Sequence, residues 1–288
     1  MKPRFLLLIV ATAFCFWWVL QTPSNDRDWP EGQSRLAEAR FEGSRVTIEG
    51  VRHFVYRSET DFDARWTSRT IDLDRVQGLD VFVSDWGWRD LVHTIVSWKI
   101  EGEAPLAISI ESRREVGEPF DPIRGLLRQY ELYYVIADER DVIRLRTNVR
   151  GEHVHLYQTS TSPDLARRLL VSYLEEVNRL REEPDFYDSL TRNCSTTTRR
   201  HLASIGVEDT WDWRVVFNGH IDELLYARGV INTSMPFDAL REASDITERA
   251  RGFRGDEQFP ARETSEQSPA RENGRNFAER IREGLPLP

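Results

Sequence analysis

Apolar and polar positions alternate, or apolar positions run together, in several short segments of the first half of the chain. Residues 45–51 (RVTIEGV) follow the two-residue period of a half-buried strand. Residues 101–105 (EGEAP) are a short loop that predicts a hairpin between the segments on either side. Runs of apolar and β-branched residues predict five further strands, at residues 79–84, 91–100, 106–111, 129–136 and 153–158.

The hydrophobic period becomes helical beyond these segments. Ser162 and Pro163 are residue types preferred at an N-cap and in a first helical turn, and apolar residues then recur at helical spacing as far as Leu180. This helix must end before Pro184. Strands followed by helices predict the α+β class, here an antiparallel sheet packed with helices. Two further helices are predicted, at residues 194–204 and 220–228.

The N-terminal residues 5–20 carry no charge, and Lys2 and Arg4 precede them. The length of this run and its basic flank predict an uncleaved signal anchor, with a cleaved signal peptide as the alternative. Basic residues stay on the cytoplasmic side of a membrane, so the rest of the chain is expected outside it. We therefore expect an anchor at 1–22, a linker at 23–34 and a main domain in the periplasm, held at the cell inner membrane by a single pass.

Composition separates the main domain from the C-terminal segment. Residues 35–240 contain the predicted catalytic-type domain, whereas 19 of the 48 residues at 241–288 are charged. Such a segment lacks the apolar content of a core, so we expect a disordered tail in which residues 276–282 form one short helix. The net charge of −9 argues against nucleic acid as a partner.

Cys194 has no evident disulfide partner. The other cysteine, Cys15, lies in the apolar N-terminal run, whereas Cys194 follows Asn193 in the segment DSLTRNCSTTTRR (188–200). Because Asn is a good N-cap residue, Cys194 is expected at the start of a helix, where unpaired amides lower a thiol pKa and stabilise an oxyanion. Cys194 is therefore a candidate nucleophile, and Asn193 and Ser195 are expected to line its site.

A cysteine nucleophile needs a histidine base, and His93 is the best placed of the six histidines. It lies on the predicted strand at 91–100. The hairpin brings Glu111 of the next strand roughly diagonal to it. A carboxylate there would orient the imidazole and fix its tautomer. We therefore expect Cys194, His93 and Glu111 to form a catalytic group.

A structural role for the same residues is the alternative. Cys194 would then be a small buried hydrophobe, and His93 would be a satisfied residue on a strand. Glu111 would pair with Arg113 or Arg114. Of the other histidines, His201 would lie two helical turns from Cys194, too far to touch it. His153 and His155 lack the neighbouring ligands that would complete a metal site, so we expect neither a metal nor a cofactor.

Seven segments between Asn25 and Thr233 together resemble the Lnb N-terminal periplasmic domain family. The resemblance implies a papain-like, circularly permuted cysteine-hydrolase fold, which the order of His93 before Cys194 fits. The segments are NDRDW (25–29), VRHFVYRSETDFDARW (51–66), HTIVSW (93–98), ISIESRRE (108–115), RQYELYYVIADERDVIRLRTN (128–148), FYDSLTRNCSTT (186–197) and GHIDELLYARGVINT (219–233).

The family's named function, implied by the same resemblance, is lipoprotein N-acyl transfer. An acyl chain moves from the glyceryl group of a lipoprotein to the amino group of its lipidated cysteine. The expected partner is therefore a lipoprotein or lipid in the outer leaflet of the membrane, within reach of the anchor at 5–20. Arg113 and Arg114 are candidates for holding an anionic headgroup. Two other classes remain open: a cell-wall peptidase or amidase with the same Cys–His pair, and a non-catalytic anchored binding domain.

Overall fold

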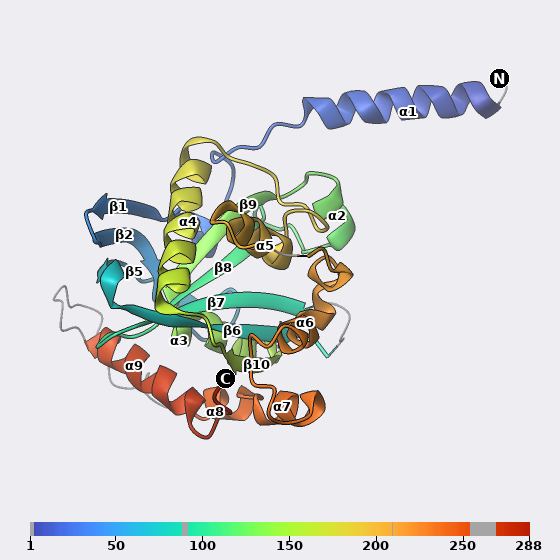
Figure 1. Cartoon of the computed structure of the whole chain (residues 1–288). Coiled ribbons are helices and arrows are strands. Elements are labelled where there is room, and N and C mark those ends of the chain that lie inside the picture. The colour runs from blue at the N-terminus through green and yellow to red at the C-terminus, as the bar shows by residue number, and fades with distance from the viewer. Residues whose placement is uncertain (1–2, 88–91, 209, 254–268) are drawn as a thin grey trace.

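An eight-stranded sheet forms the centre of the protein in the computed structural model, which describes residues 3–87, 92–208, 210–253 and 269–288 (Figure 1). The strands follow the order β1-β2-β9-β8-β7-β6-β10, and β5 pairs with β2 beside this path. Within the described residues, the pairs are antiparallel except for a parallel contact between Arg52 and Ala137. The strands are β1(Glu38–Glu42), β2(Arg45–Arg52), β5(Trp66–Asp72), β6(Val76–Asp85), β7(Val92–Ile100), β8(Leu106–Arg113), β9(Glu131–Asp138) and β10(His153–Gln158).

Helices α4 (Pro163–Glu182) and α5 (Cys194–Ser204) cover one face of this sheet (Figure 1). Ser162 caps α4 by accepting a hydrogen bond from the backbone N–H of Leu165 at 3.3 Å. The helix then buries one stripe of apolar side chains against the sheet. The Trp98 indole of β7 donates to the Ala166 carbonyl at 2.8 Å, so α4 is fixed to the sheet by a polar contact as well.

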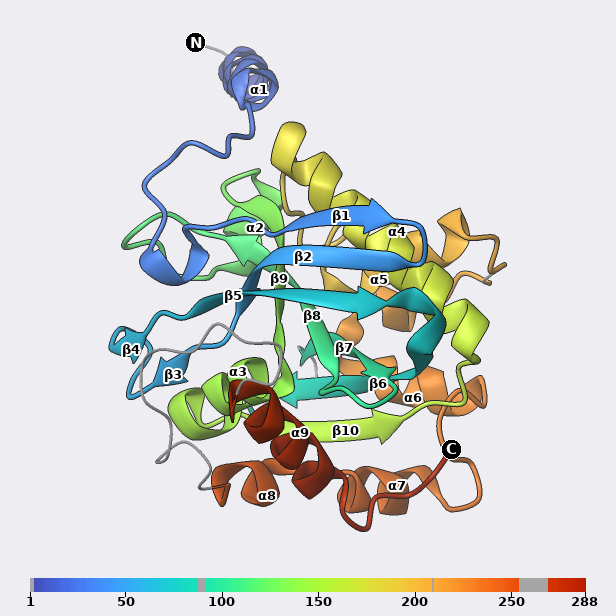
Figure 2. The same ribbon diagram turned by 90° about the vertical axis from the view of Figure 1, so that its left-hand side faces the viewer.

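Helices α3 (Glu139–Arg144), α8 (Thr247–Arg251) and α9 (Pro269–Arg282) pack on the opposite face. Figure 2 shows them grouped beside β10. Phe277 and Ile281 of α9 are fully buried in the same apolar cluster as Val142 of α3 and Phe82 of β6. The sheet is therefore enclosed between helices on both sides, which is the α+β arrangement that the sequence predicts.

The C-terminal segment corrects one expectation, because much of residues 241–288 is folded rather than disordered. Its few apolar residues recur at positions 277, 281 and 285, and burying this one face gives the segment a place in the core. The Arg282 guanidinium also donates to Glu139 at 2.6 Å and to Asp80 at 3.0 Å. The expected short helix exists as part of α9, while residues 254–268 lie outside the described residues.

The expected anchor segment forms helix α1 (Pro3–Leu20), which projects away from the sheet (Figure 1). Its described side chains are mostly exposed to solvent, among them Leu7, Phe16 and Val19. Within the described part of the chain, no helix meets both the length and the hydropathy needed to cross a bilayer.

Short elements complete the fold around the sheet. The strands β3 (Val55–Tyr56) and β4 (Phe62–Asp63) form a separate hairpin. The remaining short helices are η1(Glu31–Gln33), η2(Leu73–Arg75), α2(Pro122–Leu126), the π-helix η3(Leu145–Arg150), η4(Trp213–Val215), η5(Asn218–His220), α6(Ile221–Ala227) and α7(Phe237–Ala243).

Candidate functional site

Cys194 is the first residue of α5, as the sequence predicts. The Asn193 side chain caps this helix by accepting hydrogen bonds from the N–H groups of Ser195 at 3.0 Å and Thr196 at 2.9 Å. The backbone N–H of Asn193 donates to the Thr196 hydroxyl, which completes a capping box and explains why a helix forms despite the poor helix formers that follow. The thiol is buried, with 4% of Cys194 exposed, and lies at the positive end of the helix dipole.

His93 and Glu111 face each other from neighbouring strands. The pairing of Ile95 with Ser109, continued along β7 and β8, sets Glu111 opposite His93 rather than diagonal to it. His93 Nε2 lies 3.3 Å from Glu111 Oε1 and 2.7 Å from the Ser109 hydroxyl. A carboxylate therefore orients the imidazole, as expected.

Ser109 fixes the tautomer of His93. Its hydroxyl donates its one hydrogen to Glu111 Oε1 at 2.7 Å, because an ionised carboxylate only accepts. The same hydroxyl must then accept from His93 Nε2, which carries a hydrogen. The other ring nitrogen, Nδ1, takes part in neither of these contacts and is thereby left to exchange a proton with Cys194.

Arg146 is a further member of the site that the sequence does not reveal. Its guanidinium donates to Glu111 Oε1 at 2.9 Å from the π-helix η3 and is almost fully buried. It also donates to the Val142 carbonyl at 3.1 Å, so its position is fixed. Under the structural alternative Glu111 would pair with Arg113 or Arg114, and the structure places Arg146 there instead.

The charges at the site favour a thiolate beside an imidazolium. Burial raises the pKa of Cys194, but the charge of His93 and hydrogen bonds from His93, the Thr94 backbone and Ser195 outweigh it and lower the pKa to about 7. Burial lowers the pKa of His93, but the charge of Glu111 outweighs it and raises the pKa to about 9. The pKa of Glu111 is held well below its usual range, against its burial, by His93 and Arg146.

Asn218 is the second residue that the sequence does not reveal. Its Nδ2 lies 3.6 Å from Cys194 Sγ and donates to the Val92 carbonyl at 2.7 Å. Its Oδ1 accepts from the Val92 N–H at 3.4 Å, so one amide holds the strand that carries His93 and points a donor at the thiol. The one available signal is its place immediately before the segment at 219–233 that resembles the family.

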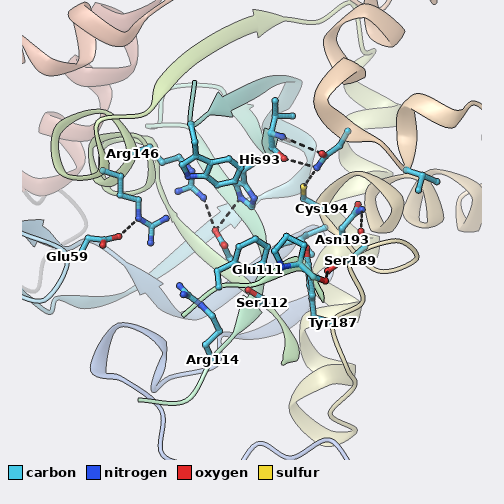
Figure 3. Close-up of a pocket in the computed structure, with 18 of the residues that line it drawn as sticks. Glu59, His93, Glu111, Ser112, Arg114, Arg146, Tyr187, Ser189, Asn193 and Cys194 are labelled. Atoms are coloured by element: carbon cyan, nitrogen blue, oxygen red, sulfur yellow. Dashed lines mark hydrogen bonds and ion pairs between the residues drawn. The ribbon is translucent and has the colours of Figure 1, made fainter. Parts of the chain in front are cut away.

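Cys194, His93 and Glu111 line one pocket, with a volume of about 500 Å³ (Figure 3). The pocket has an apolar wall and a charged end. The apolar side chains are Trp86, Val92, Ile110, Phe120, Pro122, Val149, Tyr187 and Val216. The charged end contains Glu59, Arg114, Arg146 and Arg150, and it continues into a second cavity of about 230 Å³.

The predicted binding residues are divided between this pocket and its surroundings. Arg114 and Asn193 line the pocket. Arg113 does not; its buried guanidinium lies 4.2 Å from the Trp29 ring centre and donates to the Gln33 carbonyl at 3.0 Å. Ser195 Oγ lies 4.0 Å from Cys194 Sγ but outside the pocket lining.

Two of the histidines that the sequence did not favour as the base have structural roles. His201 is bonded to the hydroxyls of Tyr134 at 2.6 Å and Ser172 at 2.8 Å, inside the core between α4 and α5. His155 stacks beside Tyr157 on β10. Across the described ranges, no cluster of three or more His, Cys, Asp or Glu side chains is arranged to hold a metal ion.

Comparison with known proteins gives one match. The family model for the Lnb N-terminal periplasmic domain matches residues 62–219, which contain His93, Glu111, Cys194 and Asn218. No curated protein matches the chain. No solved structure matches it.

Proposed function

Because the chain belongs to the Lnb N-terminal periplasmic domain family, we propose that it is a periplasmic cysteine acyltransferase that works through a thioester on Cys194. The donor is the diacylglyceryl group of a lipoprotein, and the acceptor is an amine. The observation that carries the proposal is the placement of Cys194 and His93 in the lining of one pocket, where the charge of each shifts the pKa of the other and Glu111 supports His93. A papain-like, circularly permuted arrangement, with the base before the nucleophile in the chain, belongs to the same proposal.

The first half of the reaction forms the acyl-enzyme. His93 Nδ1 holds the thiol proton, and Cys194 Sγ attacks the ester carbonyl of the donor. The Asn218 amide, 3.6 Å from Sγ, and the Cys194 backbone N–H supply hydrogen bonds to the oxyanion. The Asn193 side chain already occupies the N–H groups of Ser195 and Thr196, so these two do not contribute. The C–O bond breaks, and His93 gives its proton to the departing alcohol.

The second half transfers the acyl group. The primary amine of the acceptor attacks the thioester carbonyl, and His93 takes the proton that the amine loses. The C–S bond then breaks and Cys194 leaves as thiolate, which restores the ion pair with His93. Glu111 stays ionised throughout and holds the Nε2–H through its own contact and through Ser109. Neither a metal nor a cofactor takes part.

The apolar wall of the pocket supports an acyl chain as the group transferred. Trp86, Phe120 and Val216 offer a surface that a hydrocarbon chain prefers to water. Helix α1 supports a lipid source, since its exposed apolar side chains suit a place in or on the inner membrane with the main domain in the periplasm. We propose single-pass anchoring by this segment, as its basic flank at Lys2 and Arg4 indicates.

A mass measurement on the acyl-enzyme tests the proposal. Incubation with a diacylated lipopeptide that has a blocked amino terminus should leave a fatty-acyl mass on Cys194, and hydroxylamine should remove it. Cys15→Ser is the matched control and should keep the adduct, because Cys15 lies on α1 away from the pocket. Cys194→Ala should carry none. Full acyl transfer by Cys194→Ala would refute the mechanism.

The charged end of the pocket favours a second candidate, an amidase acting on cell-wall peptides. Arg114 and Arg150 at that end suit a carboxylate-bearing peptide, and the Cys194–His93 chemistry would be the same. Cleavage of wall peptides without any fatty-acyl adduct would assign the enzyme to this class.

A further inference from the structure

Large apolar side chains stand exposed around the mouth of the Cys194 pocket. Trp86 and Phe120 line the pocket and are 46% and 39% exposed. Three others follow directly after lining residues in the chain, and the Trp213 ring lies 6.4 Å from that of Phe217. We name this set the apolar rim; it consists of Trp86, Phe120, Ile123, Leu190, Trp213 and Phe217.

The apolar rim is not a by-product of the core. Its members come from four separate parts of the chain: the end of β6, the start of α2, the loop before α5 and the turns η4 and η5. Elsewhere on the described residues beyond α1, the exposed large apolar side chains are Phe41, Val116, Trp211 and Leu287. A soluble protein exposes single apolar residues widely, but a ring of them around a pocket marks a contact surface.

Helix α1 identifies the partner as lipid. Its exposed apolar side chains need a hydrocarbon environment, and Trp17 and Trp18 at its end are residues that favour the membrane interface. The helix leaves the main domain beside α2, because the Arg128 guanidinium, just after α2, lies 4.8 Å from the Trp18 ring centre. Figure 1 shows α1 and α2 on the same side of the molecule. A membrane that receives α1 therefore lies next to the apolar rim.

We propose that the apolar rim is a membrane-docking surface that inserts into the interfacial layer of the bilayer and brings the mouth of the pocket to the level of the lipid. The Trp and Phe rings suit this interfacial layer, because each ring has a large apolar surface and can lie beside the polar headgroups. An acyl chain would then pass from the bilayer to Cys194 without crossing water. The docking itself does not depend on which bond Cys194 attacks.

Site-specific fluorescence on the full chain tests the docking. Cys15→Ser and Cys194→Ser remove the native thiols, and a single Ile123→Cys or Phe217→Cys then carries an environment-sensitive NBD label. Neither residue lines the pocket. Phe41→Cys is the matched control, because Phe41 is also an exposed aromatic residue but lies on β1. The protein is reconstituted into vesicles of phosphatidylcholine and phosphatidylglycerol.

The expected result is a blue-shifted emission from positions 123 and 217 that doxyl-labelled lipids quench, with neither effect at position 41. Rim labels that behave like the position-41 label would overturn the proposal. A blue shift at positions 123 and 217 that appears only when a lipoprotein is added, and not with lipid alone, would also overturn the proposal. It would assign the apolar rim to a protein partner.

A kinetic measurement separates docking from chemistry. Ile123→Ser combined with Phe217→Ser should slow acyl-adduct formation from a vesicle-embedded lipopeptide by about a hundredfold, because each of the two large side chains lost weakens an apolar contact by about tenfold. Adduct formation from a water-soluble short-chain ester should be unchanged, and Phe41→Ser should affect neither substrate. Equal slowing on both substrates would count against docking. If the unmodified protein forms no adduct at all, the proposed acyl chemistry is refuted, and the fluorescence test still decides the docking proposal.

Discussion

Replacing His93 by Ala should remove most of the reactivity of Cys194 near neutral pH. The pKa of Cys194 is lowered from an ordinary 9.0 to about 7, and the charge of His93 is the largest cause of this lowering. That difference corresponds to roughly 3 kcal/mol in favour of the thiolate. Without the imidazolium, burial, which is the largest single effect on the thiol, is opposed only by the hydrogen bonds from the Thr94 backbone and Ser195, so the pKa should rise to about the ordinary value or above it. The thiolate fraction at pH 7 should then fall from about one half to about one hundredth or less.

Alkylation by iodoacetamide measures this change directly. In a Cys15→Ser background Cys194 is the one remaining thiol, so the rate of mass gain reports on it alone. The rate should have its midpoint near pH 7 in the parent protein and should shift upward in His93→Ala. Because the pKa of His93 is raised to about 9, the parent rate should change again as the imidazolium loses its proton there. A midpoint that is the same in both proteins would refute the ion pair as the cause of the low pKa.

Three other changes have defined outcomes. Glu111→Gln should lower the pKa of His93 toward its ordinary 6.5 or below, because the opposing charge 3.3 Å away is lost. The high-pH limb of the alkylation rate profile measures this pKa, and a limb at the same pH in both proteins would exclude Glu111 as the cause of the raised pKa. Asn218→Ala should lower kcat for adduct formation by about 10²–10³ if its amide binds the oxyanion, and an unchanged kcat would exclude that role. Phe277→Ala should lower the free energy of unfolding in urea by about 3–5 kcal/mol, since Phe277 is fully buried, whereas exposed Leu287→Ala should change it little; equal small effects would show that α9 is not part of the folded core.

Most of the sheet could be predicted from the sequence because its strands have strong local patterns. The strand at His153–Gln158 has the predicted bounds, and the helix after Ser162 begins where its cap predicts. Strand β5 (Trp66–Asp72) was not predicted, since its segment WTSRTID has few apolar residues, and it is held by its pairing with β2. That pairing is a long-range contact, which local periodicity does not report.

The residues of the site likewise fall into those that the sequence could reveal and those that it could not. Cys194 could be found from its cap, and His93 and Glu111 from a hairpin whose loop length nearly fixes the register. Arg146 could not be found, because the chain contains many arginines and its place beside Glu111 depends on how the π-helix η3 folds back on the sheet. Asn218 is distant in sequence from Val92, the residue it holds, and no local pattern joins the two.

The position of α9 bears on the order in which the protein can fold. One face of the sheet is completed by Phe277, Ile281 and Leu285, which follow β10 (His153–Gln158) by more than about a hundred residues. Asp80 and Glu139 likewise gain a buried guanidinium partner when Arg282 arrives. A chain that is still crossing to the periplasm therefore holds an open apolar sheet face and two carboxylates without that partner. Final closure of this face of the domain therefore waits until α9 has been exported.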